Sequence, residues 1–241
     1  MKLEDMTWLE VEHYLETQRG VILPTGSIEQ HGPLGLIGTD VICAREIAWR
    51  AAKQCSAIAA PELAYAPAPF NMSFPGTVSL TPDLYTELAS QVLFGLAHHG
   101  FDRIYILNGH GANLAPLRLA AANVDVDVRL RSWWDFEPVN TLRAQWYGDW
   151  EGMHATPSEV SITQATHRII ADPDLPPPRK LSPDYILGHA GDRHGEPDAH
   201  RRDFPDGRVG SHSALARPEH GTKLLQSAAR EVAADYLSFV A

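Results

Sequence analysis

The sequence predicts a three-layer α/β/α fold around a mostly parallel central sheet. Short apolar runs, typical of buried strands, alternate along the chain with segments of helical periodicity, as in βαβ units. The chain has 241 residues, of which 44% are hydrophobic, and this is enough to bury the core of one α/β domain. We therefore expect a single domain over residues 1–241.

The individual elements are recognised from periodicity and from helix-end signals. The best-marked helix spans 81–99, where Thr81 can cap the first turn, Pro82 occupies the first helical position and Gly100 follows the last turn. An apolar run over 103–107 predicts a buried strand, and alternation over 124–134 predicts another. The remaining predicted elements are a first helix within 1–10, a helix that begins at Asp40, and a long helix after Pro218.

The segment 172–212 breaks this alternation, because it is rich in Pro, Gly, His and charge and shows neither period. Long irregular segments in compact domains are usually functional or contact surfaces. The polar residues of this segment match the spacing of no recurrent metal site, so a lid or a subunit contact is favoured over a second metal site. These residues are Asp184, His189, Asp192, His194, His200 and Asp203.

Composition and charge argue against several classes of protein. A net charge of -10 argues against an extended nucleic-acid surface. The amino-terminal segment resembles neither a signal peptide nor a membrane span. The two cysteines, Cys43 and Cys55, are too few for a disulfide scaffold and are expected to be reduced. We expect a cytoplasmic enzyme that contacts neither nucleic acid nor membrane.

Two polar clusters at chain turns predict a metal site. Glu29 and His31 stand two apart in an extended segment, so their side chains point to the same side. Asp40 stands where a helix begins, and His110 lies just past the strand 103–107, at the edge where open α/β sheets collect ligands. Each cluster alone is compatible with an ordinary turn or a solvated strand end, but together they favour a ligand set.

Mixed imidazole and carboxylate ligands suit divalent metals, with zinc as the first choice and manganese or iron as alternatives. A carboxylate can bridge two ions, so we expect Asp40 to be shared, with Glu29 and His110 completing one shell and His31 and Glu159 the other. Metal-bound water would then supply a hydroxide nucleophile near neutral pH. The run Thr156-Pro157-Ser158-Glu159 also matches a capping box, so Glu159 is a ligand, a base or only a helix cap.

Several segments, ordered and spaced over most of the chain, resemble the creatininase family, also called creatinine amidohydrolases. The resemblance implies a compact α/β/α fold, assembly into homo-oligomers (hexamers in the family), and a two-metal centre that opens amide bonds, often in small rings. It carries ligand roles onto Glu29, His31, Asp40 and His110, and it places Trp150, Glu151 and His154 at the substrate. The matching segments are 24–33 with 38–40, 74–80, 108–113, 150–155 running to 159, and 210–221.

The sequence departs from the family pattern at three places. Ala112 stands where creatininase has a metal-binding Glu, so the last ligand must come from elsewhere, and Glu159 fits. Thr156 and Pro157 replace a Gly-Glu pair of many relatives, and Asn71 replaces a His before Phe-Pro-Gly. Creatinine is therefore not the expected substrate.

We expect a dinuclear metal-dependent hydrolase that opens a carbon–nitrogen amide bond of a small, cyclic, non-peptide substrate through metal-bound hydroxide. His154, tuned by Glu151, is expected to protonate the leaving nitrogen, and Glu159 is a further catalytic candidate. Gly76 and Thr77 suit a substrate contact and an ordinary turn equally well. The residues expected at the substrate are Trp150, Trp134, Gly76, Thr77, Asn71 and Gly109.

Three kinds of alternative remain open at this point. Deformylation of an open-chain formamide and ring opening of a cyclic ketone would use the same metal centre. A phosphate-binding module would use the Asn-Gly-His-Gly turn as an anion nest, but it would explain neither Glu29 and His31 nor Asp40. A purely structural metal protein would bind ions and turn over no amide.

Overall fold

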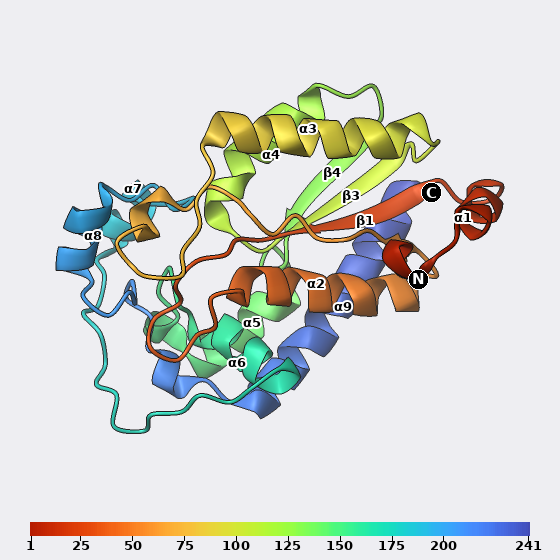
Figure 1. Cartoon of the computed structure of the whole chain (residues 1–241). Coiled ribbons are helices and arrows are strands. Elements are labelled where there is room, and N and C mark those ends of the chain that lie inside the picture. Colours follow the sequence, from red (N-terminus) through yellow and green to blue (C-terminus); the bar gives the residue numbers. More distant parts are fainter.

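The computed structural model describes all 241 residues, and a four-stranded parallel sheet lies at its centre. The strands run in the order β2-β1-β3-β4, and every pairing is parallel. The predicted α/β fold with a parallel sheet is thereby confirmed (Figure 1). The strands are β1 (Gly20–Thr25), β2 (Ile58–Ala59), β3 (Arg103–Asn108) and β4 (Asp127–Ser132).

Helices cover both faces of the sheet, which gives the three layers seen in Figure 1. Successive strand residues point to opposite faces, so Val21 and Leu23 enter one core while Ile22 enters the other. The first core lies under α1 (Trp8–Leu15), α3 (Pro82–His98) and α4 (Leu114–Ala122). The second lies under α2 (Thr39–Gln54), α5 (Glu137–Trp146), α6 (Pro157–Thr166) and α9 (Pro218–Val240).

The helix-end signals place most elements correctly. Thr81 caps α3 by accepting from the backbone N–H of Leu84, and the helix ends one residue before His99. The first helix starts later than expected, at Trp8, because Thr7 and Glu10 form a capping box that defines its first turn. The residues before it form only a 3-10 turn. No helix in the chain is both long enough and apolar enough to cross a bilayer.

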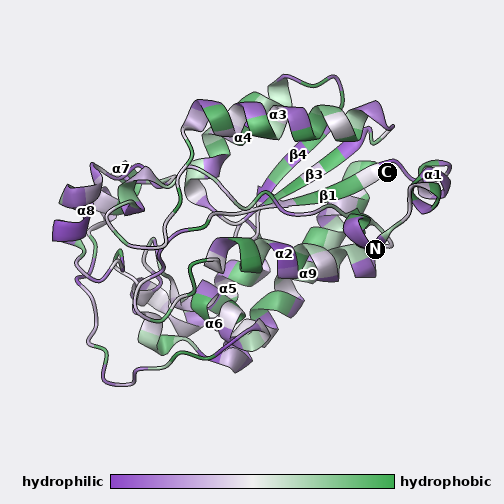
Figure 2. Cartoon of the chain, viewed as in Figure 1, coloured by the Kyte–Doolittle hydropathy of each residue, from purple (hydrophilic) through white to green (hydrophobic).

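The segment 172–212 is not wholly irregular, contrary to the expectation. It contains α7 (Pro183–Gly188) and α8 (Pro197–Asp203), each with a proline in its first turn. Both helices are too short to display a helical period in the sequence. Figure 2 shows α8 as largely hydrophilic, whereas β1 and β3 are mostly hydrophobic.

The connections around β1 and β3 create the position for a site. After β1 the chain enters α2 on one face of the sheet, and after β3 it enters α4 on the other face. Such a reversal opens a crevice at the carboxyl ends of the two strands. The register pairs Thr25 with Asn108, so the two polar loops that follow start side by side.

Candidate metal centre

Five polar side chains meet at the carboxyl edge of β1 and β3. Two come from the loop after β1, one from the turn after β3, and two from the first turns of α2 and α6. All are buried, with exposed fractions of 7% or less, although ionisable side chains rarely lie inside a protein unpaired. They are Glu29, His31, His110, Asp40 and Glu159.

The first ligand set consists of Glu29, Asp40 and His110. His110 Nδ1 lies 3.0 Å from Glu29 Oε1 and 3.1 Å from Asp40 Oδ2. Both of these carboxylate oxygens are buried without a hydrogen-bond partner. An orphaned buried oxygen is costly, and here two of them face one imidazole nitrogen. One donor atom from each residue lies within 4.8 Å of the other two, an arrangement that suits a divalent cation.

The second ligand set consists of His31, Asp40 and Glu159. His31 Nε2 lies 2.9 Å from Asp40 Oδ1 and 3.8 Å from Glu159 Oε1. Asp40 therefore turns one oxygen to each set, which is the placement that a bridging carboxylate needs. These two sets have the same members as the sets predicted from the sequence for two ions.

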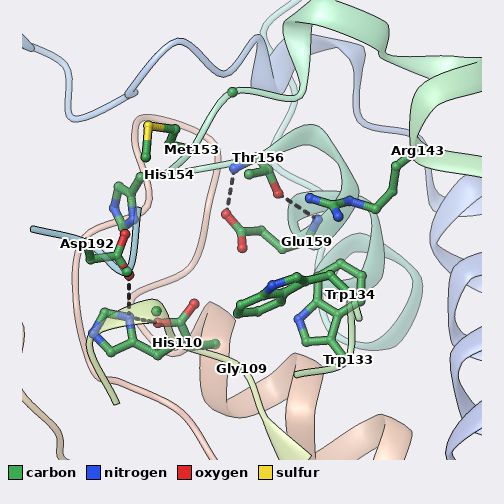
Figure 3. Close-up of a pocket in the computed structure, with 14 residues that line it drawn as sticks. Gly109, His110, Trp133, Trp134, Arg143, Met153, His154, Thr156, Glu159 and Asp192 are labelled. Atoms are coloured by element: carbon green, nitrogen blue, oxygen red, sulfur yellow. Dashed lines mark hydrogen bonds and ion pairs between the residues drawn. The ribbon is translucent and has the colours of Figure 1, made fainter. Parts of the chain in front are cut away.

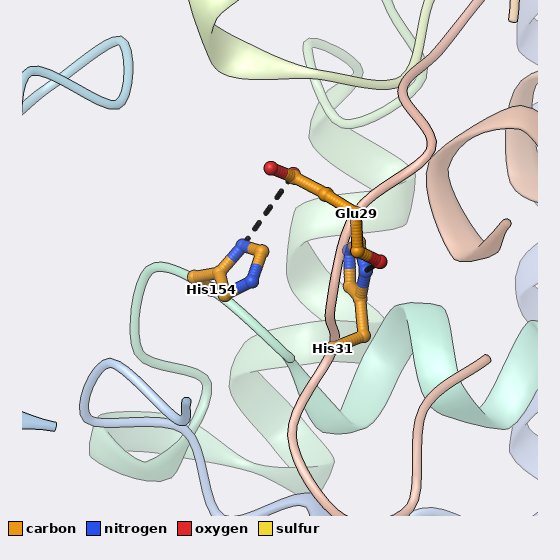
Figure 4. Close-up of side chains that lie close together, drawn as sticks. All are labelled: Glu29, His31 and His154. Atoms are coloured by element: carbon orange, nitrogen blue, oxygen red, sulfur yellow. Dashed lines mark hydrogen bonds and ion pairs between the residues drawn. The ribbon is translucent and has the colours of Figure 1, made fainter. Parts of the chain in front are cut away.

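A third group overlaps with the first two. His154 Nδ1 lies 3.8 Å from Glu29 Oε1, and its ring is 4.5 Å from the ring of His31. Figure 4 shows His154 facing Glu29 with His31 beside it. The three residues also satisfy the distance condition for a cation. Because Glu29 and His31 belong to the other sets as well, this group would compete with them for ligands.

Each histidine is oriented by a hydrogen bond to a backbone carbonyl. His110 Nε2 donates to the carbonyl of Pro67 at 2.8 Å, and His154 Nε2 donates to that of Gln30 at 2.7 Å. His31 Nδ1 makes the equivalent bond to the Glu29 carbonyl at 3.1 Å. Since a carbonyl only accepts, these nitrogens carry the proton and the other ring nitrogen faces the carboxylates. Metal-ligating histidines are held in this way.

The turn after β3 is fixed by Asn108 and Gly109. The Asn108 Oδ1 accepts from the backbone N–H of His110 at 3.2 Å, while its Nδ2 donates to the His110 carbonyl at 2.7 Å. A Cβ at Gly109 would lie 2.5 Å from the backbone oxygen of Asp40. The end of β3 can therefore pack directly against the first turn of α2, and this contact brings His110 to Asp40.

Burial and neighbouring charges shift the protonation of these groups in opposite directions. Burial disfavours the charge on His31, but Asp40, Glu159 and Glu29 outweigh it and raise the pKa of His31 to about 10. Burial raises the pKa of Glu159 to about 7, and His31 offsets this only in part. Burial, reinforced by His31, lowers the pKa of His154 to about 3, so this imidazole is neutral. A cation would compete with protons for the other two imidazoles, because ligating nitrogens must be unprotonated.

A cavity of about 210 Å³ opens beside the ligand sets (Figure 3). Asp40, His110, His154 and Glu159 line it on the side of the proposed metals. The aromatic walls are Trp133 and Trp134, which follow β4. Trp133 is also part of the hydrophobic core, with 1% of its surface exposed.

Arg143 of α5 is the one Lys or Arg side chain that lines this cavity. Its Nε donates to Glu151 Oε1 at 3.0 Å and its Nη1 donates to Asn140 Oδ1 at 2.7 Å. Its guanidinium lies 5.5 Å from the centre of the Trp133 ring. Nη2 makes no hydrogen bond to the protein, so it can donate to an acceptor on a ligand.

Of the residues expected at the substrate, Trp134 and Gly109 line the cavity, whereas the other four lie outside its lining. Asn71 instead donates to Glu29 Oε2 at 2.9 Å and so orients a member of the first ligand set. Thr77 accepts from the backbone N–H of Gln30 at 3.0 Å. The remaining two are Gly76, which packs against Ile37, and Trp150, which packs against His212.

The three residues expected to be catalytic lie in different surroundings. His154 and Glu159 line the cavity. Glu151 does not contact His154 as expected, because Ser158 and Arg143 both donate to its Oε1 and hold it behind the cavity wall. Glu151 therefore orients Arg143 through this hydrogen bond.

Sequence reasoning missed Arg143, Met153 and Asp192, all of which line the cavity. A lone Arg or Met in a helix or loop carries no signal of its own. Asp192 was noted among the polar residues of 172–212, but spacing along the chain could not indicate which of them reaches the centre.

The chain is similar to known proteins over most of its length. A sequence model of the creatininase family, described as creatinine amidohydrolase, matches residues 4–236. The creatinine amidohydrolase of Pseudomonas putida is 30% identical over 190 residues, which cover 70% of this chain and 73% of that protein. The mycofactocin precursor peptide peptidase of Mycolicibacterium smegmatis is 34% identical over 120 residues, 47% of this chain and 48% of that one. The solved structure of a creatininase mutant superposes with a TM-score of 0.82 at 25% identity, covering 99% of this chain and 98% of that one.

Proposed function

This chain belongs to the creatininase family, and on that premise we propose that it is a dinuclear metal-dependent amidohydrolase of a small substrate. The observation that carries the proposal is Asp40, whose two carboxylate oxygens face two separate ligand sets. Zinc suits these nitrogen and oxygen ligands, and manganese and iron are the alternatives. The buried, unpartnered oxygens of Glu29 and Asp40 support a cation in this place.

Two divalent ions would be held by Glu29, Asp40 and His110 and by His31, Asp40 and Glu159. When bound, they would supply a nucleophile from water near neutral pH and polarise the substrate carbonyl. The carbonyls of Pro67 and Glu29 point the ligating nitrogens of His110 and His31 inward, where a bound cation would take the place of a proton.

His154 is the proton carrier of the proposed reaction. Its Nε2–H is engaged with the Gln30 carbonyl, and its lowered pKa leaves Nδ1 without a proton. Unprotonated Nδ1 is the ring atom open to the proton of the attacking water, and the low pKa makes the imidazolium that forms a strong acid toward the departing nitrogen. It then delivers this proton to the departing nitrogen as the carbon–nitrogen bond breaks. The sequence predicts His154 as the general acid that protonates the leaving nitrogen. In the reaction proposed here it first acts as the general base toward water and then as that acid.

The cavity supports a small and flat substrate. Trp133 and Trp134 provide aromatic walls, and the volume of about 210 Å³ leaves little room beyond a single ring. The free Nη2 of Arg143 favours a substrate with a carbonyl or carboxylate at this end of the cavity. These features favour a cyclic, non-peptide amide over a peptide, although the Mycolicibacterium smegmatis relative is a peptide peptidase.

A metal analysis combined with a substrate screen tests the proposal. The chain, loaded with zinc or manganese, would be incubated with lactams, cyclic imides, formamides, cyclic ketones and short peptides, and products would be identified by mass. We expect about two ions per chain, hydrolysis of a cyclic amide, and loss of activity in a chelator and in Asp40→Asn. The exposed His98 of α3 supplies the control His98→Ala. Absence of stoichiometric metal, or hydrolysis that survives chelation, would overturn the proposal.

A further inference from the structure

Asp192 is a partly exposed acid that the segment 172–212 inserts beside the metal centre. Its side chain is 11% exposed, and its Oδ2 lies 3.7 Å from His110 Nδ1. This is the same nitrogen that faces Glu29 and Asp40 at 3.0 and 3.1 Å. Figure 3 shows the Asp192 carboxylate directed toward His110. The other acids of the segment, Asp184 and Asp203 among them, are exposed.

The position of Asp192 depends on the absence of a side chain at Gly111. A Cβ on Gly111 would lie 2.2 Å from Asp192 Oδ2 and 2.9 Å from its Cγ. The carboxylate therefore fills the space that any other residue at position 111 would occupy. Asp192 itself has a φ of 55°, a left-handed conformation that non-glycine residues seldom adopt. Such backbone geometry persists where the surroundings hold it, often at functional sites.

Aromatic packing anchors the segment that carries Asp192. The rings of Tyr185 and His189 stack with centroids 3.8 Å apart. Two residues beyond Asp192, the ring of His194 packs on Phe70 at 4.7 Å. Asp192 thus lies between a ring contact inside the segment and a second one, His194 on Phe70, that packs the segment against the body of the domain.

Three carboxylates then surround one imidazole nitrogen in a buried space. Asn71 and His31 bond the outer oxygens of Glu29 and Asp40, but Glu29 Oε1 and Asp40 Oδ2, which face His110, have no hydrogen-bond partner. A divalent cation neutralises such a cluster. Two ligand atoms that share a tetrahedral ion at about 2.1 Å lie roughly 3.4 Å apart, which is close to the separations around His110 Nδ1.

We propose that Asp192 is a further ligand of the ion that Glu29, Asp40 and His110 would hold. We also propose that this ligand couples metal binding to docking of the part of the segment 172–212 that runs from α7 through α8, residues 183–204. The inference rests on the dinuclear centre proposed above. Removal of the ion would release the carboxylates to repel one another, so the segment would undock. Binding of the ion would fasten the segment over one end of the cavity.

Zinc affinity provides the test, because it is read without turnover. Metal-free wild type, Asp192→Asn and Asp184→Asn would be titrated with Zn²⁺ against a chromophoric chelator. We expect Asp192→Asn to weaken one of two sites by about 10- to 100-fold. Asp184→Asn, an exposed acid of the same segment, is expected to match wild type. Tryptic cleavage at the exposed Arg193 is expected to be suppressed by Zn²⁺ in wild type and in Asp184→Asn but not in Asp192→Asn.

Gly111→Ala is the second variant, because it displaces the Asp192 carboxylate and removes no ligand. It is expected to weaken the same site and to abolish the protection at Arg193. Unchanged zinc affinities in either Asp192→Asn or Gly111→Ala would overturn the inference. If wild type and both variants bind two ions with the same affinities, the role of Asp192 is refuted and the dinuclear centre stands. If wild type binds no zinc, the proposed function itself is refuted.

Discussion

Replacing Glu159 by Gln is expected to stabilise the metal-free chain and to weaken its binding of metal. Glu159 accepts a hydrogen bond from the Thr156 backbone N–H at 2.5 Å, while its own N–H donates to Thr156 Oγ1 at 3.3 Å. A Gln at this position can accept the same bond, so the helix cap is kept. The substitution removes only the charge.

The pKa of Glu159 sets the size of the stability effect. Burial raises this pKa from 4.5 to about 7. The folded state therefore holds the proton more tightly than the unfolded state, and stability is lost as the pH rises from 4.5 to 7. At about 1.4 kcal/mol per pKa unit, the ionised carboxylate costs the fold about 3 kcal/mol above pH 7. Glu159→Gln is expected to gain stability of this order at pH 8 and almost none at pH 4.

The chain contains a matched control for this experiment. Glu10 occupies the same position in the capping box of α1, but it is exposed and belongs to none of the ligand sets. Its pKa is lowered by the hydrogen bond from the Thr7 backbone, so Glu10→Gln is expected to lose rather than gain stability at pH 8. Urea unfolding at pH 4 and pH 8, in the presence of a chelator, measures both variants against wild type.

Zinc titration of the same proteins completes the test. Glu159→Gln is expected to bind one ion at least about tenfold more weakly, and Glu10→Gln is expected to bind as wild type does. If the two variants changed stability alike and neither changed zinc affinity, Glu159 would be only a helix cap. The second ligand set would then be wrong.

Three further predictions concern the proton carrier, the cavity wall and the segment over it. His154→Gln is expected to lower kcat by about 10²- to 10⁴-fold with metal content unchanged. If the variant lost metal in proportion to its loss of activity, His154 would instead be a ligand. Arg143→Gln is expected to raise KM about tenfold and to change kcat less, and Arg143→Lys to restore part of the loss; a change confined to kcat in steady-state assays would contradict this role. Burial lowers the pKa of His200 to about 4, so the folded state disfavours its protonation and stability should fall between pH 6.5 and about 4. Urea midpoints of His200→Phe should fall less across this window, and a profile parallel to wild type would refute the explanation.

Much of the fold follows from signals within a few neighbouring residues. Thr81 and Pro82 start α3, Thr7 starts α1, and the apolar run 103–107 forms β3, because capping, proline geometry and side-chain alternation act over one or two turns. The chemistry of the centre follows in the same way. Carboxylates and imidazoles at the ends of predicted elements indicate a metal site before their distances are known.

The folded chain alone shows which of several equivalent groups arrive at the centre. Asp184 and Asp192 have the same chemistry, but packing brings only Asp192 to the space at Gly111 and leaves Asp184 exposed. Glu151 stands three residues before His154, yet Ser158 and Arg143 draw it away. These outcomes depend on contacts between segments far apart along the chain, whose side chains compete for the same space and the same hydrogen bonds. Chemical type and order are properties of the chain, whereas proximity is a property of its packing.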